Sequence, residues 1–227
     1  MIIIPFWLGA IEGGVVWQHI PFFIGWILLY LATYPMLLLF KRKKMALYAK
    51  WTCTYLAGAI IFLLFPLAKN PAIVYFGLGM IPFFLINAYF SAKNNDRALA
   101  NDFSAIFAFS LAGLASSFLG SGHLSSKAWL IFLISVLFFI GCTFYVKTMI
   151  REKKNPQFKW ISWTYHLFLP FVWLVSGYWI VAIAYLPSMV RAIKFYGKAL
   201  SPKKIGIFEI MNAAAFFLII GWQLVVN

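Results

Sequence analysis

The sequence predicts an all-α fold, a polytopic membrane helical bundle of about nine transmembrane helices. Two observations predict it. The chain is 64% hydrophobic and only 11% charged, whereas soluble domains carry about 25% charged residues. Most of the charges also fall between long apolar segments rather than within them. A water-soluble fold could not bury this much apolar surface. We therefore expect a single transmembrane domain over residues 1–227.

Nine apolar segments remain when the chain is cut at charges, Gly and Pro, and each is compared with the roughly 20 residues that a helix needs to cross a bilayer. The first is short and contains Gly9, Gly13 and Gly14. It is either a broken helix or a span whose start precedes the given sequence, and we favour the second. The shortest connection lies near Gly177. The expected spans are 2–16, 20–40, 48–68, 71–92, 103–120, 127–147, 160–177, 178–196 and 205–226.

The net charge of +14 indicates topology rather than affinity for nucleic acid, because Lys and Arg concentrate in the cytoplasmic loops of membrane proteins. Nine spans put the basic loops on one side and leave only Lys69 and Lys127 on the other. This predicts a cytoplasmic N-terminus and an external C-terminus. The basic residues assigned to the cytoplasmic side include Lys41, Arg42, Lys43, Lys44, Lys50, Lys147, Arg151, Lys153, Lys154, Lys159, Lys194, Lys198, Lys203 and Lys204.

An internal similarity predicts a repeat of four spans. Thr33-Tyr34 followed by KRKK and YAKW resembles Thr143-Phe144 followed by REKK and QFKW, about 110 residues later. Such repeats are common in membrane transporters. Chance similarity between apolar segments is the alternative. We expect four plus four spans with a ninth appended.

The stretch from Asn87 to Asp102 concentrates polar side chains. Asn87, Asn94 and Asn101 recur every seven residues, so on one helix they would share a face. A polar face in the hydrocarbon must point toward the bundle or a wet cavity. Two alternatives stay open: Asn101 and Asp102 cap a helix that starts at Phe103, or Asn87 bonds a neighbouring helix. The candidate ligand-binding residues here are Asn87, Asn94, Asn95, Asp96, Arg97, Asn101 and Asp102.

Further polar residues are expected on the same cytoplasmic side. They would converge with Asp96 and Asp102 on one cavity lined by Arg, Lys and Asn, which suits an anion such as a phosphate or diphosphate. For Arg191 and Glu209 a structural ion pair is the alternative, and for His166 a buried structural role. These candidates are Tyr145, Lys147, Arg151, His166, Arg191, Glu209 and Asn212.

Other polar residues favour structural interpretations. His19 and His123 fall on the outer side, where an interfacial position is expected. Cys53 and Cys142 lie in apolar segments without metal-binding spacing, so we interpret both as small buried hydrophobic residues.

Five segments carry a resemblance to a known family: IIIPFWLG, WQHIPFF, LATYP, NNDRALANDFSAI and YVKTMIREKKN. They resemble the YwiC-like family of bacterial integral membrane proteins, and the similarity runs through the whole chain. The resemblance implies a multi-pass protein of the bacterial inner membrane and implies no reaction. Family members usually begin with a few more residues and a Gln-His-Gly-Ala-Trp segment, which is missing here.

A more distant similarity is architectural. UbiA-type intramembrane prenyltransferases also have nine spans, a cytoplasm-facing site and two aspartate motifs that hold a prenyl diphosphate through Mg²⁺. Asn95-Asp96 and Asn101-Asp102 are the nearest counterpart of the first motif, with a different spacing, and the second has no counterpart. Two Mg²⁺ ions need several oxygen ligands each, so Asp96 and Asp102 are weak metal candidates.

The leading hypothesis is a membrane-embedded binding protein or small transporter for a lipid-like or phosphorylated molecule, with no cofactor. The first alternative is a UbiA-like enzyme that acts on an isoprenoid diphosphate and uses Mg²⁺. The second is an accessory subunit of a membrane complex. Beyond the lipid bilayer and such a ligand, the sequence predicts no nucleic-acid partner and identifies no protein partner.

Overall fold

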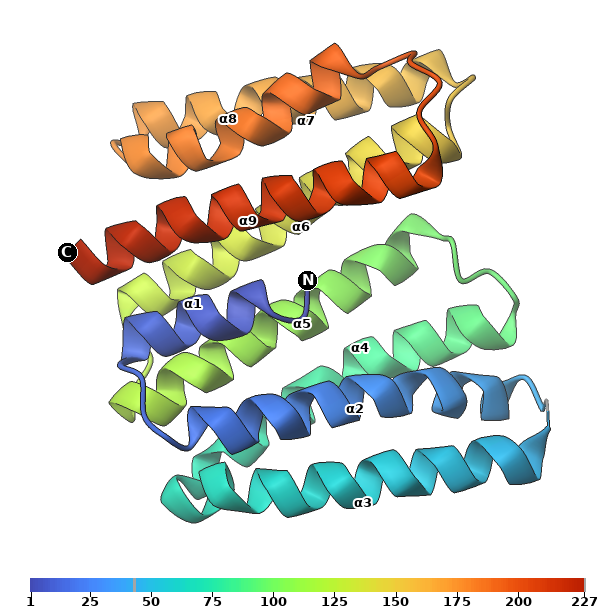
Figure 1. Ribbon diagram of the computed structural model, residues 1–227, viewed down its shortest axis with the longest axis vertical. Helices are drawn as coiled ribbons and strands as arrows, with labels where there is room; N and C mark the ends of the chain where they lie inside the picture. The colour runs from blue at the N-terminus through green and yellow to red at the C-terminus, as the bar shows by residue number, and fades with distance from the viewer. Residues whose placement is uncertain (43, 227) are drawn as a thin grey trace. The chain divides into compact units, whose positions relative to one another are not determined.

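The computed structural model describes residues 1–42 and 44–226. Over these residues the chain is all-helical, as the hydropathy predicts, and contains no strand (Figure 1). Lys43, assigned above to the first basic loop, lies outside the described residues. The helices are α1 (Ile4–Gly13), α2 (His19–Phe40), α3 (Met45–Lys69), η1 (Pro71–Ile73), α4 (Val74–Ala92), α5 (Leu99–Ser121), α6 (Ser126–Ile150), α7 (Pro156–Val175), α8 (Trp179–Lys194) and α9 (Pro202–Val226).

Six segments of the described chain are long and apolar enough to cross a membrane: α2, α3, η1 with α4, α5, α6 and α9. They indicate a multi-pass membrane protein. The helix α1 has 10 residues and α8 has 16, fewer than the roughly 20 that a perpendicular span needs. The expected count of nine spans and the four-plus-four repeat therefore stay predictions.

The helix ends follow local chemistry. Proline begins α7 and α9, where its missing N–H and fixed φ cost nothing. The Asn155 side chain caps α7 by accepting from the backbone N–H groups of Gln157 and Phe158, as expected for a helix N-cap. Gly177, with φ of +82°, makes the turn between α7 and α8, a conformation that favours glycine. The short connection expected at this residue is confirmed.

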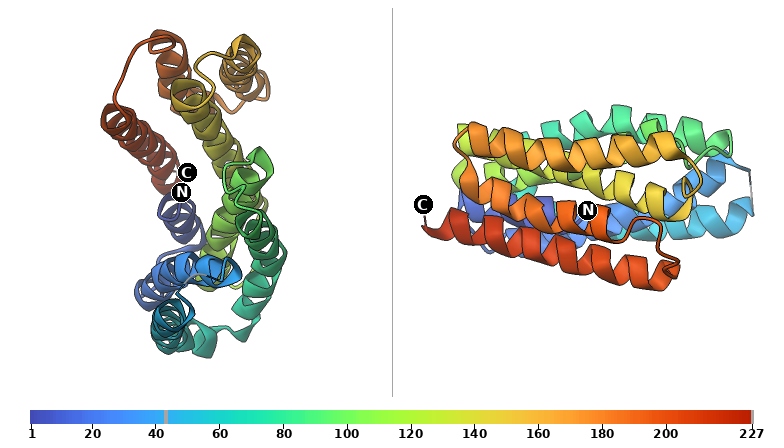
Figure 2. Two further views of the ribbon diagram at one scale, coloured as in Figure 1. Left: turned by 90° about the vertical axis from the view of Figure 1, so that its right-hand side faces the viewer. Right: turned by 90° about the horizontal axis from the view of Figure 1, so that it is seen from above.

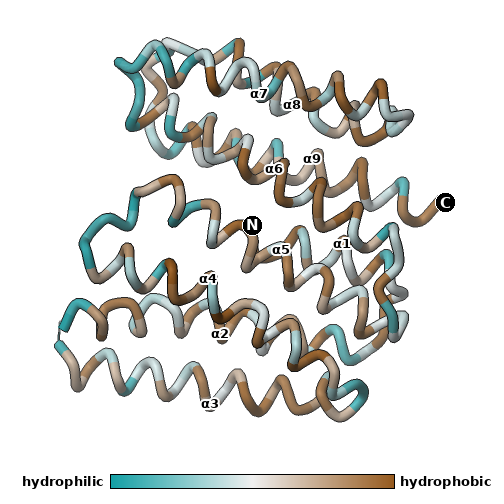
Figure 3. The backbone as a smooth tube through the Cα atoms, turned by 180° about the vertical axis from the view of Figure 1, so that it is seen from behind, coloured by the Kyte–Doolittle hydropathy of each residue, from teal (hydrophilic) through white to brown (hydrophobic). Residues whose placement is uncertain are grey.

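Two compact units divide the chain, the first from Met1 to Phe132 and the second from Leu133 onward. Within the first unit, α2 packs beside α3, and α1 packs beside α5 (Figures 1 and 2). Within the second, α7 packs beside α8 and α8 beside α9. Hydrophilic segments of each unit gather at helix ends and loops (Figure 3). The single transmembrane domain stays a prediction.

Small residues bring α1 and α5 into close contact. A Cβ atom added to Gly9 would lie 2.0 Å from the carbonyl oxygen of Gly113, and one added to Gly113 would lie 2.6 Å from that of Pro5. Only glycine permits backbones to approach this closely, as at other helix interfaces in membranes. The core beside this contact is aromatic: Phe6 packs edge-on against Phe22 with ring centroids 5.1 Å apart.

Candidate functional site

The stretch from Asn87 to Asp102 is not one helical face. The helix α4 ends at Ala92 and α5 begins at Leu99, so Asn94 and Asn95 lie in the connecting turn. Asn94 adopts a left-handed conformation with φ of +53°, which asparagine tolerates better than most residues. The expected seven-residue face is therefore wrong, because the backbone reverses between its members.

The alternative in which Asn101 and Asp102 cap a helix starting at Phe103 is also wrong. The helix α5 starts four positions earlier, and its N-cap residue, Ala98, makes no side-chain capping bond. Asn101 and Asp102 lie in the first turn. The acidic Asp102 suits this place because a helix N-terminus carries partial positive charge.

Asn87 joins two helices of the first unit. Its side-chain nitrogen donates to the backbone oxygen of Phe83, at 2.8 Å, and to the hydroxyl of Ser104 on α5, at 2.7 Å. Ser104 is buried. The interhelix hydrogen bond, one of the two alternatives for this residue, is therefore present. It anchors α4 to α5 where the apolar interior of the unit ends.

Asp96 and Lys41 form an ion pair at the same end of the unit, with 2.7 Å between Lys41 Nζ and the carboxylate. The Lys41 hydrogen bond holds the pKa of Asp96 below its ordinary value. The Asn101 side chain donates to the backbone oxygen of Asp96, at 2.8 Å. Asp96 is therefore a paired carboxylate rather than an isolated loop charge. Arg97, which follows it in the loop, carries a further positive charge.

An apolar cavity of about 300 Å³ lies between α2, α3, α4 and α5, at the lower end of the volumes found for small-molecule sites. Its polar lining residues are Tyr30, Thr33 and Asn87. The Asn87 amide thus borders this cavity as well as bonding Ser104. Apolar side chains make up the remainder of the lining, among them Trp26, Leu29, Met36, Leu37, Leu56, Met80, Ile81, Phe84 and Phe109.

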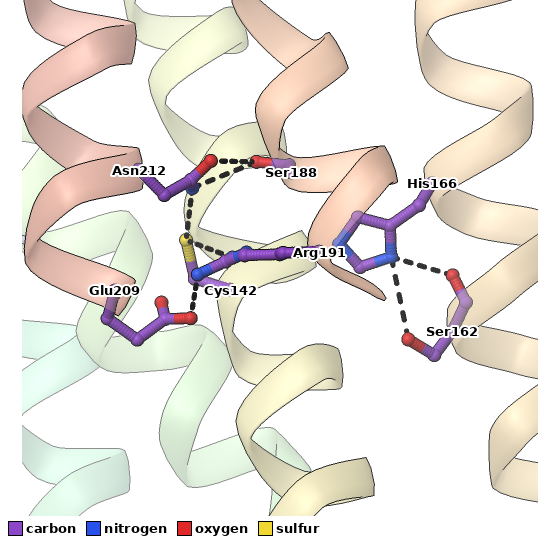
Figure 4. A network of polar contacts seen from close by, with 7 residues as sticks. All are labelled: Cys142, Ser162, His166, Ser188, Arg191, Glu209 and Asn212. Atoms are coloured by element: carbon purple, nitrogen blue, oxygen red, sulfur yellow. Dashed lines mark hydrogen bonds and ion pairs between the residues drawn. The ribbon is translucent and has the colours of Figure 1, made fainter. Parts of the chain in front are cut away.

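In the second unit, Arg191 is the centre of a buried polar network (Figure 4). The guanidinium donates to the Glu209 carboxylate from Nη1 and to Cys142 Sγ from Nη2, the latter at 3.5 Å. It also lies over the Tyr145 ring, 4.3 Å from the centroid, a favourable cation–π arrangement. The structural ion pair, which was the alternative for Arg191 and Glu209, is present.

Asn212 adds a second connection between α9 and α8, the helix that carries Arg191. It exchanges hydrogen bonds with Ser188, at 2.9 and 3.1 Å, and donates to Cys142 Sγ at 4.0 Å. Cys142 is buried, as expected, and also serves as an acceptor. Cys53 is exposed on α3, so its interpretation as a buried residue is wrong.

His166 lies beside the network on α7. Its Nδ1 donates to the carbonyl oxygen of Ser162 at 2.7 Å, and its Nε2 faces Arg191 (Figure 4). Both His166 Nε2 and the Tyr145 hydroxyl are buried without a hydrogen-bond partner in the described part of the chain. Of the other two candidates of this unit, Lys147 is buried and Arg151 is exposed in the turn after α6. The convergence of these groups with Asp96 and Asp102 stays a prediction.

Glu12 is a polar residue that the sequence analysis missed. Its two carboxylate oxygens accept hydrogen bonds from Ser117 on α5 and from Ser125. Ser125 Oγ also accepts from the backbone N–H of Ala128 at 2.9 Å, so Glu12 ties α1 to the ends of two other helices. A carboxylate inside an apolar segment was the available signal, because such residues are costly unless paired.

His19 is also corrected, from an interfacial residue to a core residue. It is completely buried, and its Nε2 hydrogen-bonds the backbone oxygen of Ser116 on α5 at 2.8 Å. Its other ring nitrogen contacts the backbone of Val16. A second group of polar contacts thus lies at the end of the first unit opposite Asp96.

For metal binding, no group of three or more His, Cys, Asp or Glu side chains within the described ranges is placed to hold an ion. Asp96, one of the two weak metal candidates, is engaged by Lys41. The donor set therefore gives no support to a site for two Mg²⁺ ions, which needs many oxygen ligands.

Comparison with known proteins gives a consistent family. The model of the YwiC-like protein family matches residues 1–117. The chain is 45% identical to the Bacillus subtilis protein described as uncharacterized protein YwiC, over 96% of this chain and 92% of the relative. It is 40% identical to an uncharacterized protein of Haemophilus influenzae, over 97% and 92%. No solved structure matches. The chain belongs to the YwiC-like protein family.

Proposed function

We propose that this protein binds, and carries within the membrane, an amphipathic lipid-like anion whose apolar part occupies the cavity of the first unit. The apolar cavity bordered by Asn87 is the observation that carries the proposal. A hydrocarbon chain suits such a lining because it brings no polar group that would lose its hydrogen bonds on burial.

The charges near this cavity favour an anionic head group. Leu37 and Asn87 line the cavity. One turn further along the same helices lie Lys41 and Ser91, because residues four apart share a face. Lys41 already holds the Asp96 carboxylate, so its ammonium group can pair with an oxyanion. The cations of this end within the described residues include Lys41, Arg42, Lys44, Lys93 and Arg97, set against Asp96 and Asp102.

The route into the cavity would be lateral, from the bilayer. Ile81 and Tyr30 line it and are 47% and 44% exposed. A lipid-like molecule already dissolved in the bilayer could pass between such side chains without crossing water. The protein would then hold the ligand at the membrane surface that carries the basic loops.

The direct test is mass spectrometry of lipids retained after mild purification, followed by titration with two probes that share one tail. Hexadecyl phosphate should bind saturably, and hexadecyltrimethylammonium should bind at least about tenfold more weakly, a difference of about 1.4 kcal/mol. An Ala108→Phe change, which fills the cavity, should remove the hexadecyl phosphate site. Equal binding of both probes, or unchanged binding by the filled variant, would refute the proposal.

The metal-dependent enzyme remains a second proposal with its own test. Mg²⁺-dependent binding of a polyprenyl diphosphate, lost in Asp96→Ala and Asp102→Ala, would favour prenyl transfer. Binding that survives removal of metal would favour the carrier. A stoichiometric protein partner without any bound lipid would instead favour an accessory subunit.

Placement in the bacterial inner membrane, with the basic loops in the cytoplasm, is part of the proposal. Single cysteines at positions 96, 153 and 203 should react only from the cytoplasmic side, and one at position 123 only from outside. The parent protein for this test carries replacements of Cys53 and Cys142. Labelling of any of the first three positions from outside would overturn the topology.

A further inference from the structure

A second apolar cavity adjoins the first. It has a volume of about 200 Å³ and is lined by α2, the end of α3, η1, α4 and α5. Neither serine, threonine nor any charged side chain lines it. The two cavities share the lining residues Trp26, Leu29, Gly77 and Met80. Because the same four residues border both, the cavities are adjacent at this point, and the two together are called the groove below.

The cavities are arranged end to end along the helices. The first is bordered by Leu37 and Asn87 at its far end. The second is bordered by Phe22 and Ile73 at the opposite end. From Phe22 to Leu37, α2 rises about 22 Å at 1.5 Å per residue. The groove therefore follows roughly three quarters of the 30 Å hydrocarbon thickness of a bilayer.

This end-to-end arrangement fits one extended tail. Two tails side by side would need a cavity that is wide in the direction across the helices. These cavities instead follow one another along α2 and α4, which lie near each other in the first unit (Figure 1). The polar and cationic groups are at one end only, near Asn87 and Lys41. The end near Phe22 and Ile73 has an apolar lining, which suits the tip of a tail.

Gly77 borders both cavities and leaves open space where a side chain would be. A Cβ atom added there would meet no heavy atom within 4 Å, although the residue borders both cavities. A larger side chain at this position would therefore occupy open space beside both cavities without striking the protein. Gly79, two residues away on α4, borders neither cavity, and a Cβ there would touch only Leu111 at 4.0 Å.

We propose that the ligand of the first unit is a single-tailed amphiphile with an anionic head, whose long tail passes Gly77 and ends between Phe22 and Ile73. This inference rests on the proposed function and adds the number and length of the tails. A short tail would fill only the cavity beside Asn87. A two-tailed lipid would leave one tail in the bilayer.

The test uses hexadecyl phosphate and octyl phosphate, each with a photoreactive diazirine at the last carbon of the tail. In the wild-type protein, the hexadecyl probe should label the lining of the second cavity near Ile73, and excess unlabelled hexadecyl phosphate should compete. The octyl probe should label the first cavity. Peptide mass spectrometry locates both labels.

Gly77→Leu should reduce labelling near Ile73 by the hexadecyl probe about tenfold, the factor for an overpacking cost of about 1.4 kcal/mol. It should reduce octyl labelling of the first cavity much less, because the head-group end of that cavity, at Asn87, lies ten residues or about 15 Å further along α4. Gly79→Leu, which makes the same glycine-to-leucine change in α4, should behave as the wild type. Retention of octyl labelling also shows that the Gly77→Leu protein is folded.

The outcomes separate the two proposals. Saturable hexadecyl labelling confined to the first cavity, or labelling near Ile73 that is equal in Gly77→Leu and wild type, would overturn the long-tail inference and leave the binding function standing. Absence of saturable labelling by either probe would overturn both. Labelling near Ile73 that Gly77→Leu alone abolishes would support both.

Discussion

The ion pair between Arg191 and Glu209 provides the sharpest test of the second unit. Changing Glu209 to Leu would leave the guanidinium buried, since the Arg191 side chain is only 5% exposed. The remaining contacts, the Tyr145 ring at 4.3 Å and Cys142 Sγ at 3.5 Å, are weaker than a carboxylate. Breaking a buried pair from one side costs about 3–5 kcal/mol. Because the Glu209 side chain is 21% exposed, we expect a cost near the lower limit, about 3 kcal/mol.

The double variant Arg191→Leu/Glu209→Leu should be more stable than Glu209→Leu alone, by about 2 kcal/mol. Removal of both charges leaves no unpaired ion, and such replacements are often neutral. Unfolding by sodium dodecyl sulfate in mixed micelles, followed by circular dichroism, would measure the cycle. Asp96→Leu is the control, because the Asp96 side chain is 49% exposed. This substitution should lower the free energy of unfolding by less than about 1 kcal/mol. A double variant no more stable than Glu209→Leu would refute the argument.

Further predictions concern the first unit. Gly113→Ala should abolish the monodisperse folded protein in detergent, because the added Cβ atom would strike the backbone of Pro5. Gly206→Ala is the control and should leave the folded protein monodisperse, because a Cβ atom added there meets no heavy atom within 4 Å. Glu12→Gln should lower the free energy of unfolding in micelles by about 1–3 kcal/mol. The amide nitrogen of Gln would replace one of the two carboxylate oxygens that accept hydrogen bonds from the Ser117 and Ser125 hydroxyls. Lys41→Met should weaken hexadecyl phosphate binding about fivefold, and Asp96→Asn should strengthen it about fivefold, because the charge pairing at stake is about 1 kcal/mol. Stronger binding by Lys41→Met together with weaker binding by Asp96→Asn would exclude Lys41 as the head-group contact. Lys41 lowers the pKa of Asp96 in the folded protein. The small stabilisation from Asp96 should therefore stay constant above the pKa of Asp96 in the unfolded chain, and be lost only as the pH falls through the lower pKa of the folded protein. A loss of stability from this ion pair near neutral pH would contradict the assignment.

Hydropathy predicted the helices well because the apolar segments of this chain are separated by charged or glycine-containing turns. Each expected span overlaps a helix of the described chain. The largest error at a site was the start of α5. One alternative made Asn101 and Asp102 caps of a helix that starts at Phe103, but the backbone N–H of Asp102 already bonds the carbonyl of Ala98 at 3.1 Å. Polar residues at a helix start can lie on either side of the cap, and residue type alone does not decide which.

The candidate site could be predicted only where one helix supplied the signal. Asn87 was identified because an amide deep in an apolar segment needs a partner. Glu12 was missed because its partners, Ser117 and Ser125, follow it by 105 and 113 residues. Serine is a common residue, so its presence in the sequence does not indicate a hydrogen bond to a distant carboxylate. The positions of the two cavities could not be predicted from the sequence either, because they are lined mostly by the Leu, Met, Phe and Trp side chains that are common in membrane helices.

The two units differ in what they offer a ligand, and this difference assigns the candidate residues to two roles. In the second unit, Arg191 bonds Glu209 and Cys142, and Asn212 bonds Ser188 and Cys142. An entering anion would first have to displace the Glu209 carboxylate, which is 21% exposed, whereas the Asp96 carboxylate on Lys41 is 49% exposed. In the first unit, the polar groups border an apolar cavity instead of filling it. The Arg191→Leu/Glu209→Leu protein should therefore bind hexadecyl phosphate as the wild type does. A loss of binding in that protein, with stability retained, would instead place Arg191 at the ligand.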